Sequence, residues 1–195
     1  MAAKTPGEMI KRSADLAFAV VLLIVTSIPM LVIAFMVRAT SRGPVLYWSD
    51  RVGIGNKIFQ MPKFRTMFTD TPAVATHLLV NAGDHVTSVG AFLRKLSLDE
   101  LPQLWSILKG DMSLVGPRPA LYNQYDLISL RTERGVHRIM PGVTGWAQIN
   151  GRDDIPIPLK VKFDEFYLKN RSFLFDMKII FLTIMKAIRA EGVKH

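Results

Sequence analysis

Cysteine is absent from the 195 residues, so the chain has no disulfide framework and no thiolate metal site. Histidine is scarce, and its spacing matches no zinc motif. Internal repeats and low-complexity tracts are also lacking. The two glycines of Gly53-Ile54-Gly55 are not a dinucleotide fingerprint, because no third glycine and no following helix fit that pattern. These absences exclude disulfide scaffolds, common zinc proteins and Rossmann-type dinucleotide binding.

Acidic residues are outnumbered, with 16 Asp and Glu against 25 Lys and Arg, which gives a net charge of +9. Such an excess fits a nucleic acid, an anionic membrane surface or a polyphosphate substrate. Hydrophobic residues make up 49% of the chain, and their excess is concentrated in one N-terminal run. The run favours membrane and polyphosphate partners, and we expect no nucleic acid.

The apolar run at residues 16–37 contains no charged side chain and is long enough to cross a bilayer as a helix. No small-x-small cleavage pattern follows it before Arg38, so a secretory signal peptide is disfavoured. Cytoplasmic flanks of membrane helices collect Lys and Arg. Here basic residues lie on both sides, among them Lys11, Arg12, Arg38 and Arg42. Both ends of the run would therefore suit the cytoplasmic face.

Thr26, Ser27 and Pro29 interrupt the middle of the run. Proline removes a backbone donor and clashes with the preceding turn, so the helix bends there. The hydroxyls of Thr26 and Ser27 can bond the freed carbonyls. We weigh two readings about equally: a re-entrant helix–break–helix that dips into one leaflet, and a kinked helix that spans the membrane.

The composition predicts an anchor at residues 1–42 and a small α-rich α/β catalytic domain at residues 43–195. The segment 174–189 is amphipathic at helical spacing, which suits an interfacial helix or packing on the core. Residues 141–152 hold four glycines and are expected to form a loop. Short strands are expected at 45–48 and 57–61, and helices at 86–96, 100–109, 121–138, 163–169 and 174–189.

Asp99 and Glu100 are the candidate reactive pair. A capping box of Ser97 with Glu100 would explain these acids without any chemistry. Pro102 argues against it, because a cap at Ser97 would place the proline where a helical donor is needed. We therefore expect Asp99 to cap the helix at 100–109, at an end that receives phosphate oxygens. Asp99 could attack phosphorus, and Glu100 could act as a base or hold a divalent cation.

A carboxylate that attacks a diphosphate needs nearby positive charge. Lys63 and Arg65 lie together in Lys63-Phe64-Arg65-Thr66-Met67. Arg118 stands between two prolines, which fix its backbone, whereas most arginines are surface charges. Further candidates are Arg134, Arg138 and Arg152.

Long motifs of the chain resemble those of the bacterial sugar transferase family, the monotopic polyprenol-phosphate phosphoglycosyl transferases. The resemblance runs from about Lys11 to Arg189. It is carried by Lys63 to Met67, Ser97 to Leu104, Leu108 to Pro119, Pro141 to Arg152, Asp164 with Tyr167, and Asp176 with Lys178. Two positions depart from it: Ile28 separates Ser27 from Pro29, and Ser106 stands where an asparagine is usual.

The resemblance implies a re-entrant helix in the bacterial inner membrane and a catalytic domain on its cytoplasmic face. It implies Mg²⁺ and a ping-pong mechanism in which Asp99 attacks the β-phosphate of a UDP-sugar and releases UMP. The sugar phosphate then passes to undecaprenyl phosphate. Glu100 is the partner acid, and Asp99 and Glu100 are the metal candidates. Lys63, Asp164 and Asp176 match further functional positions.

Inner-membrane lipid is an expected partner, and a homodimer is allowed. The competing interpretation is a membrane-anchored basic adaptor that binds anionic lipid or nucleic acid. It accounts for the net charge and the anchor but not for the acidic pair beside Pro117-Arg118-Pro119.

Overall fold

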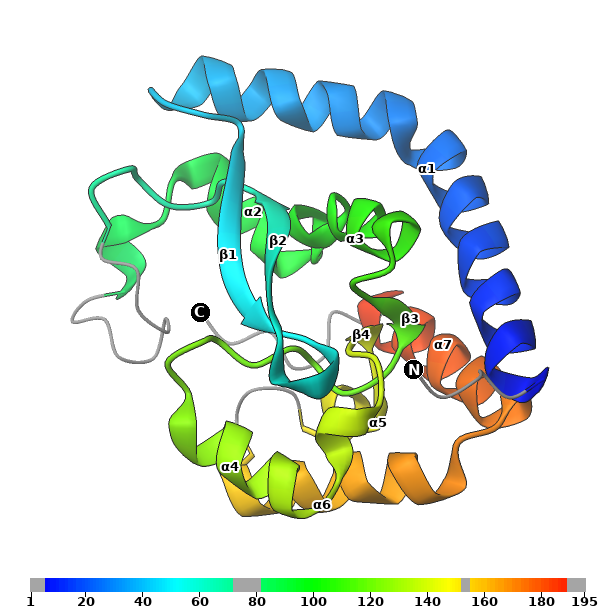
Figure 1. Cartoon of the computed structure of the whole chain (residues 1–195). Coiled ribbons are helices and arrows are strands. Elements are labelled where there is room, and N and C mark those ends of the chain that lie inside the picture. Colours follow the sequence, from blue (N-terminus) through cyan, green and yellow to red (C-terminus); the bar gives the residue numbers. More distant parts are fainter. Residues whose placement is uncertain (1–5, 72–81, 152–154, 189–195) are drawn as a thin grey trace.

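The computed structural model describes residues 6–71, 82–151 and 155–188. Helices dominate and the strands are short, which confirms the α-rich α/β class (Figure 1). The elements in chain order are α1 (Pro6–Thr40), β1 (Leu46–Val52), β2 (Ile58–Phe64), α2 (Ser88–Lys95), α3 (Gln103–Lys109), β3 (Ser113–Val115), α4 (Tyr125–Glu133), β4 (Gly142–Thr144), α5 (Trp146–Ile149), α6 (Ile157–Asn170) and α7 (Phe173–Ile188).

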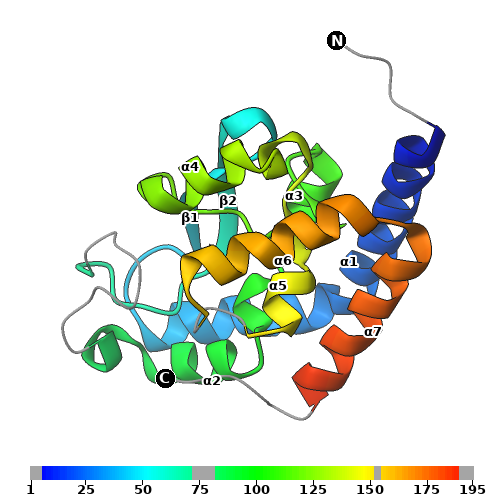
Figure 2. The same cartoon turned by 90° about the horizontal axis from the view of Figure 1, so that it is seen from below.

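Helix α1 is the one described helix that is long and apolar enough to cross a membrane. It is continuous over 35 residues, with Pro29 inside it. It turns sharply near its middle, so that its first half lies beside α7 and its second half passes over α2 and α3 (Figures 1 and 2). Pro29 has no N–H, so the Val25 carbonyl lacks its helical donor. Contrary to the expectation from the sequence, the hydroxyls of Thr26 and Ser27 do not bond that carbonyl but donate to the carbonyls of Leu22 and Ile24.

One face of α1 packs on the rest of the chain through both of its halves. Ala19, in the first half, is fully buried against Met61, Leu104 and other core residues. Ile33 and Val37, in the second half, are buried in a separate cluster of apolar side chains. The helix is therefore part of the core of the molecule as well as a long apolar segment.

Polar contacts hold the first turns of α1 to the chain that precedes residues 116–119, the functional loop, which follows β3 and carries Arg118. The Asp15 carboxylate is buried and accepts hydrogen bonds from the Ser113 hydroxyl, at 2.7 Å, and from the Leu114 backbone. Arg12 donates to the carbonyls of Leu108 and Met112, near the C-terminal end of α3. Cations are favourable at that end of a helix because carbonyls are left unpaired there.

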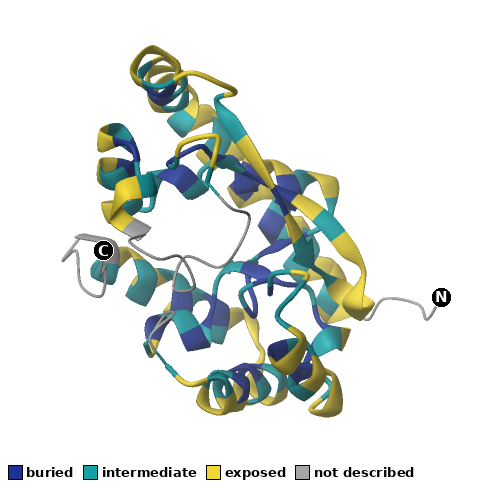
Figure 3. Cartoon of the chain, turned by 90° about the vertical axis from the view of Figure 1, so that its left-hand side faces the viewer, coloured by how far each residue is buried: buried dark blue, intermediate teal, exposed yellow. Residues whose placement is uncertain are grey.

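The strands form two small sheets. β1 and β2 pair antiparallel, with Tyr47 opposite Lys63, whereas β3 and β4 pair in parallel, with Ser113 opposite Gly142. Glycine is required at this second pairing: a Cβ on Gly142 would lie 2.0 Å from the backbone nitrogen of Gly116. Buried residues gather on β3, on the second half of β2 and on the inward sides of the helices, whereas β1 is mostly exposed or half-buried (Figure 3).

Several predicted bounds need correction. The two early strands are confirmed but are longer than expected, and the helix at 163–169 is the end of the longer α6. The segment 121–138 divides into α4 and a 3₁₀ turn at Val136–Arg138. The loop expected at 141–152 is wrong in part, because it contains β4 and α5. Its glycines allow close backbone approach and are not only signs of a loop.

Replacing Asp15 by Ala should destabilise the protein. The change leaves the Leu114 N–H without its acceptor and removes the shorter of the two hydrogen bonds of the buried Ser113 hydroxyl, and an unsatisfied group of this kind typically costs about 1–3 kcal/mol. The measurement is the free energy of unfolding in detergent. Ser13→Ala, an exposed change on the same helix, is the control and should be neutral. Equal stability of the two variants would contradict a structural role for Asp15.

Candidate active site

The acidic pair lies in the connection between α2 and α3. Ser97 has a left-handed backbone, with φ of +56°, and starts a 3₁₀ turn at Leu98–Glu100. Such a conformation is uncommon for residues other than glycine and often marks functional turns. The expectation that Asp99 caps α3 is wrong, because Pro102 occupies the N-cap position and Asp99 lies inside the 3₁₀ turn.

Helix α2 is held firmly on the segment after β2, and this fixes the start of the turn. Thr87 caps α2 by accepting a hydrogen bond from the Gly90 N–H at 2.9 Å. Gly90 lies so close to Thr66 that a Cβ would be 2.0 Å from its carbonyl oxygen. Near the end of α2, Arg94 donates to the Thr66 hydroxyl at 2.9 Å.

Glu100 brings two cations together. Lys63, at the end of β2, donates to Glu100 Oε1 at 2.8 Å. Arg118, in the loop after β3, donates to both carboxylate oxygens, with its Nη2 2.6 Å from Oε1 and its Nη1 3.3 Å from Oε2. Bidentate pairing of this kind fixes both distance and orientation. The structure thus joins three predicted site residues that are far apart in the sequence.

Asp99 lies beside this cluster and is buried, with 8% of its surface exposed. Its Oδ2 is 3.9 Å from Lys63 Nζ. No described residue donates a hydrogen bond to its carboxylate, so both oxygens keep lone pairs for a reaction or a ligand.

The two acids have opposite pKa shifts. Burial raises the pKa of Asp99 above its ordinary value; the charge of Lys63 opposes this and the charge of Glu100 adds to it. Burial alone would also raise the pKa of Glu100. The charges and hydrogen bonds of Arg118 and Lys63 outweigh it and hold that pKa far below the ordinary range. Glu100 is therefore firmly ionised, whereas Asp99 takes up a proton more readily.

Three other predicted residues lie away from the acidic pair. Arg65 is buried and donates to the backbone carbonyls of residues 41, 44 and 67. Asp176 is buried and accepts hydrogen bonds from Lys11 and from the Tyr167 hydroxyl. Arg138 is exposed at the end of a 3₁₀ turn. Arg152 lies outside the described residues.

Asp164 is connected to the site through Arg131, a residue that sequence analysis missed. Asp164 is buried and accepts from Arg131 Nη2 at 2.7 Å, and Arg131 Nη1 donates to the Arg118 carbonyl. Arg94 was also missed as a site residue, although its positive charge acts on Asp99. Its place five residues before Asp99, at the end of a helix, is the signal that was available.

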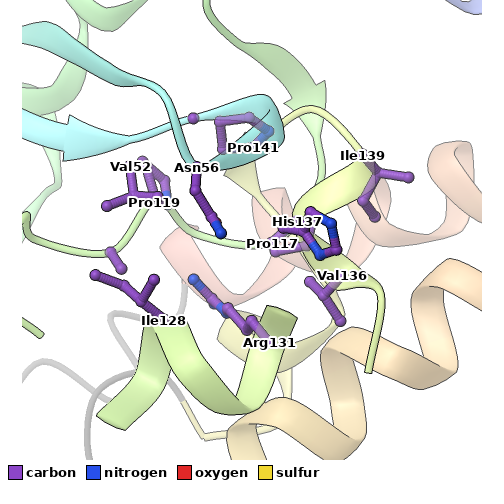
Figure 4. Close-up of a pocket in the computed structure, with 12 residues that line it drawn as sticks. Val52, Asn56, Pro117, Pro119, Ile128, Arg131, Val136, His137, Ile139 and Pro141 are labelled. Atoms are coloured by element: carbon purple, nitrogen blue, oxygen red, sulfur yellow. The ribbon is translucent and has the colours of Figure 1, made fainter. Parts of the chain in front are cut away.

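A small cavity lies behind the functional loop, away from the acidic pair. Arg131, His137 and Asn56 line it together with mostly apolar residues (Figure 4). Its volume of about 30 Å³ has room for a water molecule but not for a nucleotide sugar. The cavity is therefore not the substrate site.

The described residues contain no group of three or more His, Asp or Glu that could hold a metal alone. Mg²⁺ commonly binds one or two carboxylates together with substrate phosphates. Asp99 and Glu100 fit that requirement, because a carboxylate can accept more bonds than these two receive from described residues. A divalent cation would thus be shared with a bound diphosphate.

The long apolar helix is compatible with a membrane anchor, and the acid–cation cluster is suited to binding phosphates. The family is shown directly: the chain matches the bacterial sugar transferase model over residues 6–190, so it belongs to that family. It is a sugar-phosphate transferase, and the interpretation as a non-enzymatic adaptor is wrong.

Similar proteins span a wide range of lengths. A sugar transferase of Bacillus subtilis named EpsL is 44% identical over 96% of this chain and 91% of its own length. An undecaprenyl-phosphate glucose phosphotransferase of Komagataeibacter xylinus is 41% identical over 91% of this chain but only 36% of its own length. A UDP-glucose:undecaprenyl-phosphate glucose-1-phosphate transferase of Escherichia coli is 41% identical, and 40% of its length is covered. The chain thus matches only part of these two larger enzymes.

Replacing Lys63 by Met should raise the pKa of Asp99 further, because it removes the cation that opposes burial. The titration of Asp99 can be followed by NMR of protein labelled with ¹³C at the aspartate carboxyls. Lys109→Met is the control, since exposed Lys109 pairs with Asp111 and should leave Asp99 unaffected. An unchanged or lower pKa in Lys63→Met would contradict the electrostatic role of Lys63.

Proposed function

We propose that the chain moves a sugar 1-phosphate from a UDP-sugar to undecaprenyl phosphate by a ping-pong mechanism. The observation that carries the proposal is the buried Asp99, without a hydrogen bond from described residues, beside Lys63 and Arg118. The names of similar proteins support the donor and acceptor classes. The reaction would be the first membrane step in the assembly of a lipid-linked glycan.

In the first half-reaction, an ionised Asp99 oxygen attacks the β-phosphorus of the UDP-sugar. The bond from that phosphorus to the bridging oxygen breaks, the bridging oxygen keeps the electron pair, and UMP leaves. In the second, a phosphate oxygen of undecaprenyl phosphate attacks the same phosphorus, and the Asp99 carboxylate is the leaving group. Lys63 and Arg118 stabilise the negative charge that builds up on the phosphoryl oxygens.

Neither half-reaction requires a proton transfer, because the attacking carboxylate and phosphate are already anionic. Glu100 is a poor general base, since two cations hold its pKa low. We assign it the task of orienting Lys63 and Arg118 toward the diphosphate. Mg²⁺ held by Asp99 and Glu100 together with the diphosphate would supply further charge neutralisation.

The two ends of α1 contact the same domain. This supports the interpretation of α1 as a re-entrant helix over that of a helix that spans the membrane. Lys11 pairs with Asp176 near the start of α1, and the Ser41 carbonyl accepts from Arg65 just after its end. A helix that crosses a hydrocarbon core of about 30 Å puts its ends on opposite sides of the bilayer. One small domain could not then hold both ends.

The outer face of α1 is suited to lipid. Large apolar side chains are exposed along its middle, including Ile24, Ile28, Leu31 and Phe35. The break involves Ser27 and Pro29.

Exposed Leu174, Phe181 and Ile184 give α7 an apolar face beside the first half of α1. We therefore place α7 at the interface of the inner membrane, with the catalytic domain on the cytoplasmic face; α2, with exposed Phe92, is the second interfacial candidate.

Asp99→Asn should abolish turnover and the covalent intermediate while the protein stays folded. An amide is not a nucleophile here, and loss of a nucleophile costs at least about 10³-fold in rate. The assay is UMP release from a panel of UDP-sugars, with and without undecaprenyl phosphate, together with trapping of radiolabelled sugar phosphate on the protein. Exposed Asp126→Asn is the control. Normal turnover of Asp99→Asn would rule out this nucleophile.

Topology can be tested without background labelling, because the chain has no cysteine. Single cysteines at Ala3 and Ser41 should both react with an impermeant thiol reagent applied from the cytoplasmic side. Inverted membrane vesicles and intact spheroplasts provide the two sides. Labelling of the two positions from opposite sides would exclude re-entry and restore a spanning helix.

A further inference from the structure

Arg131 and Asp164 form an ion pair inside the domain. Arg131 of α4 is 7% exposed and Asp164 of α6 is 1% exposed. Nε and Nη2 of Arg131 both donate to Asp164 Oδ2, at 2.9 and 2.7 Å. Because Asp164 is so deeply buried, a substrate cannot contact it, although its position matches the family pattern.

A third donor of Arg131 reaches the backbone of the functional loop. Its Nη1 donates to the Arg118 carbonyl at 2.8 Å. Arg118 lies between Pro117 and Pro119, which are both buried and have a fixed φ. A hydrogen bond to this carbonyl therefore fixes one of the few backbone torsions that remain free to re-aim the Arg118 guanidinium.

The pair costs energy to bury, which favours a positioning role over one in stability alone. Replacing a buried ion pair by apolar residues of similar volume is often neutral or stabilising, so burial by itself does not account for it. The carboxylate keeps the Arg131 guanidinium in one orientation, and that orientation aims Nη1 at the Arg118 carbonyl. Arg131 also lines the small cavity, so side-chain packing does not enclose it on every side (Figure 4).

We propose that Arg131 and Asp164 are positioning residues that hold the Arg118 loop so that its guanidinium reaches Glu100 and the substrate diphosphate. The proposal rests on the proposed function for the substrate and on the structure for the contact. Arg131 acts through Arg118 and does not itself touch the reacting atoms.

The test is a double-mutant cycle. Arg131→Met with Asp164→Leu removes both charges together, so neither is left buried and unpaired. We expect kcat/KM for UMP release to fall about 10- to 100-fold, as for other residues that orient a reactive group. In an Arg118→Ala background the same pair of changes should cost at most about twofold, because the residue it positions is gone.

The matched control is Lys169→Met with Glu165→Leu on the surface of α6, which removes the ion pair of Glu165 with Lys169 and also that of Glu165 with Arg134. Its activity should be unchanged in both backgrounds. The proposal would be overturned if the paired change lowered kcat/KM equally with and without Arg118. It would also be overturned if the loss of activity merely followed the fraction of folded protein in thermal unfolding. If the double variant does not fold, Arg131→Lys keeps the charge pair but lacks the forked donors, and it enters the same cycle.

A readout independent of turnover separates this proposal from the proposed function. Modification of Arg118 by phenylglyoxal, followed by peptide mass spectrometry, should be faster in the Arg131→Met/Asp164→Leu variant than in the unmodified chain. Two results can be combined. If Arg118 is modified faster in the variant but the wild-type protein releases no UMP, the positioning role is supported and the proposed reaction is rejected. Unchanged modification would overturn the positioning role, whatever the reaction is.

Discussion

The Glu100 carboxylate is shared between Lys63 and Arg118, and the geometry of the site depends on this arrangement. Lys63 ends one strand of the first sheet, and Arg118 follows a strand of the second. One ionised group therefore joins two sheets that have no strand in common. Its negative charge also offsets the repulsion between these two cations, which lie beside Asp99, the carboxylate that we propose attacks a phosphate. Without Glu100, Lys63 and Arg118 would repel each other and Asp99 would bind them directly, which would reduce its ability to react.

Helix α1 contacts the segments that carry the site residues, so it is not a separate attachment. Asp15, in the first half of α1, holds the start of β3, and β3 leads in a few residues to Arg118. The second half of α1 packs on the cluster that contains Leu93, on the helix that leads to Asp99. Removing or shifting the anchor would therefore disturb both sides of the site. This connection explains why an apolar helix carries a buried aspartate near its start.

Sequence reasoning named the acidic pair and two cations as candidates, because the signals for them are local, and the structure brings these four residues together. Asp99 with Glu100 and Arg118 between two prolines are each visible within a few residues. The start of α3 could not be predicted from local signals. It depends on the left-handed backbone of Ser97, which no residue propensity favours. Arg131 was missed because its partner lies 33 residues away and only the fold joins them. β3 and β4 were missed because each has three residues and pairs with a distant segment.

The positions that match the family pattern separate into two groups once their surroundings are known. Lys63, Asp99, Glu100 and Arg118 lie together, and Arg118 keeps 30% of its side chain exposed, which leaves it room to contact a substrate. Asp164 and Asp176 are buried and already accept hydrogen bonds from partners on other helices. A sequence motif shows only that a position is constrained, and both kinds of constraint leave the same trace. Asp99 is about as buried as Asp176, so hydrogen bonding is what separates them: a carboxylate that accepts no hydrogen bond from described residues is open to react, whereas one held by its partners supports the fold.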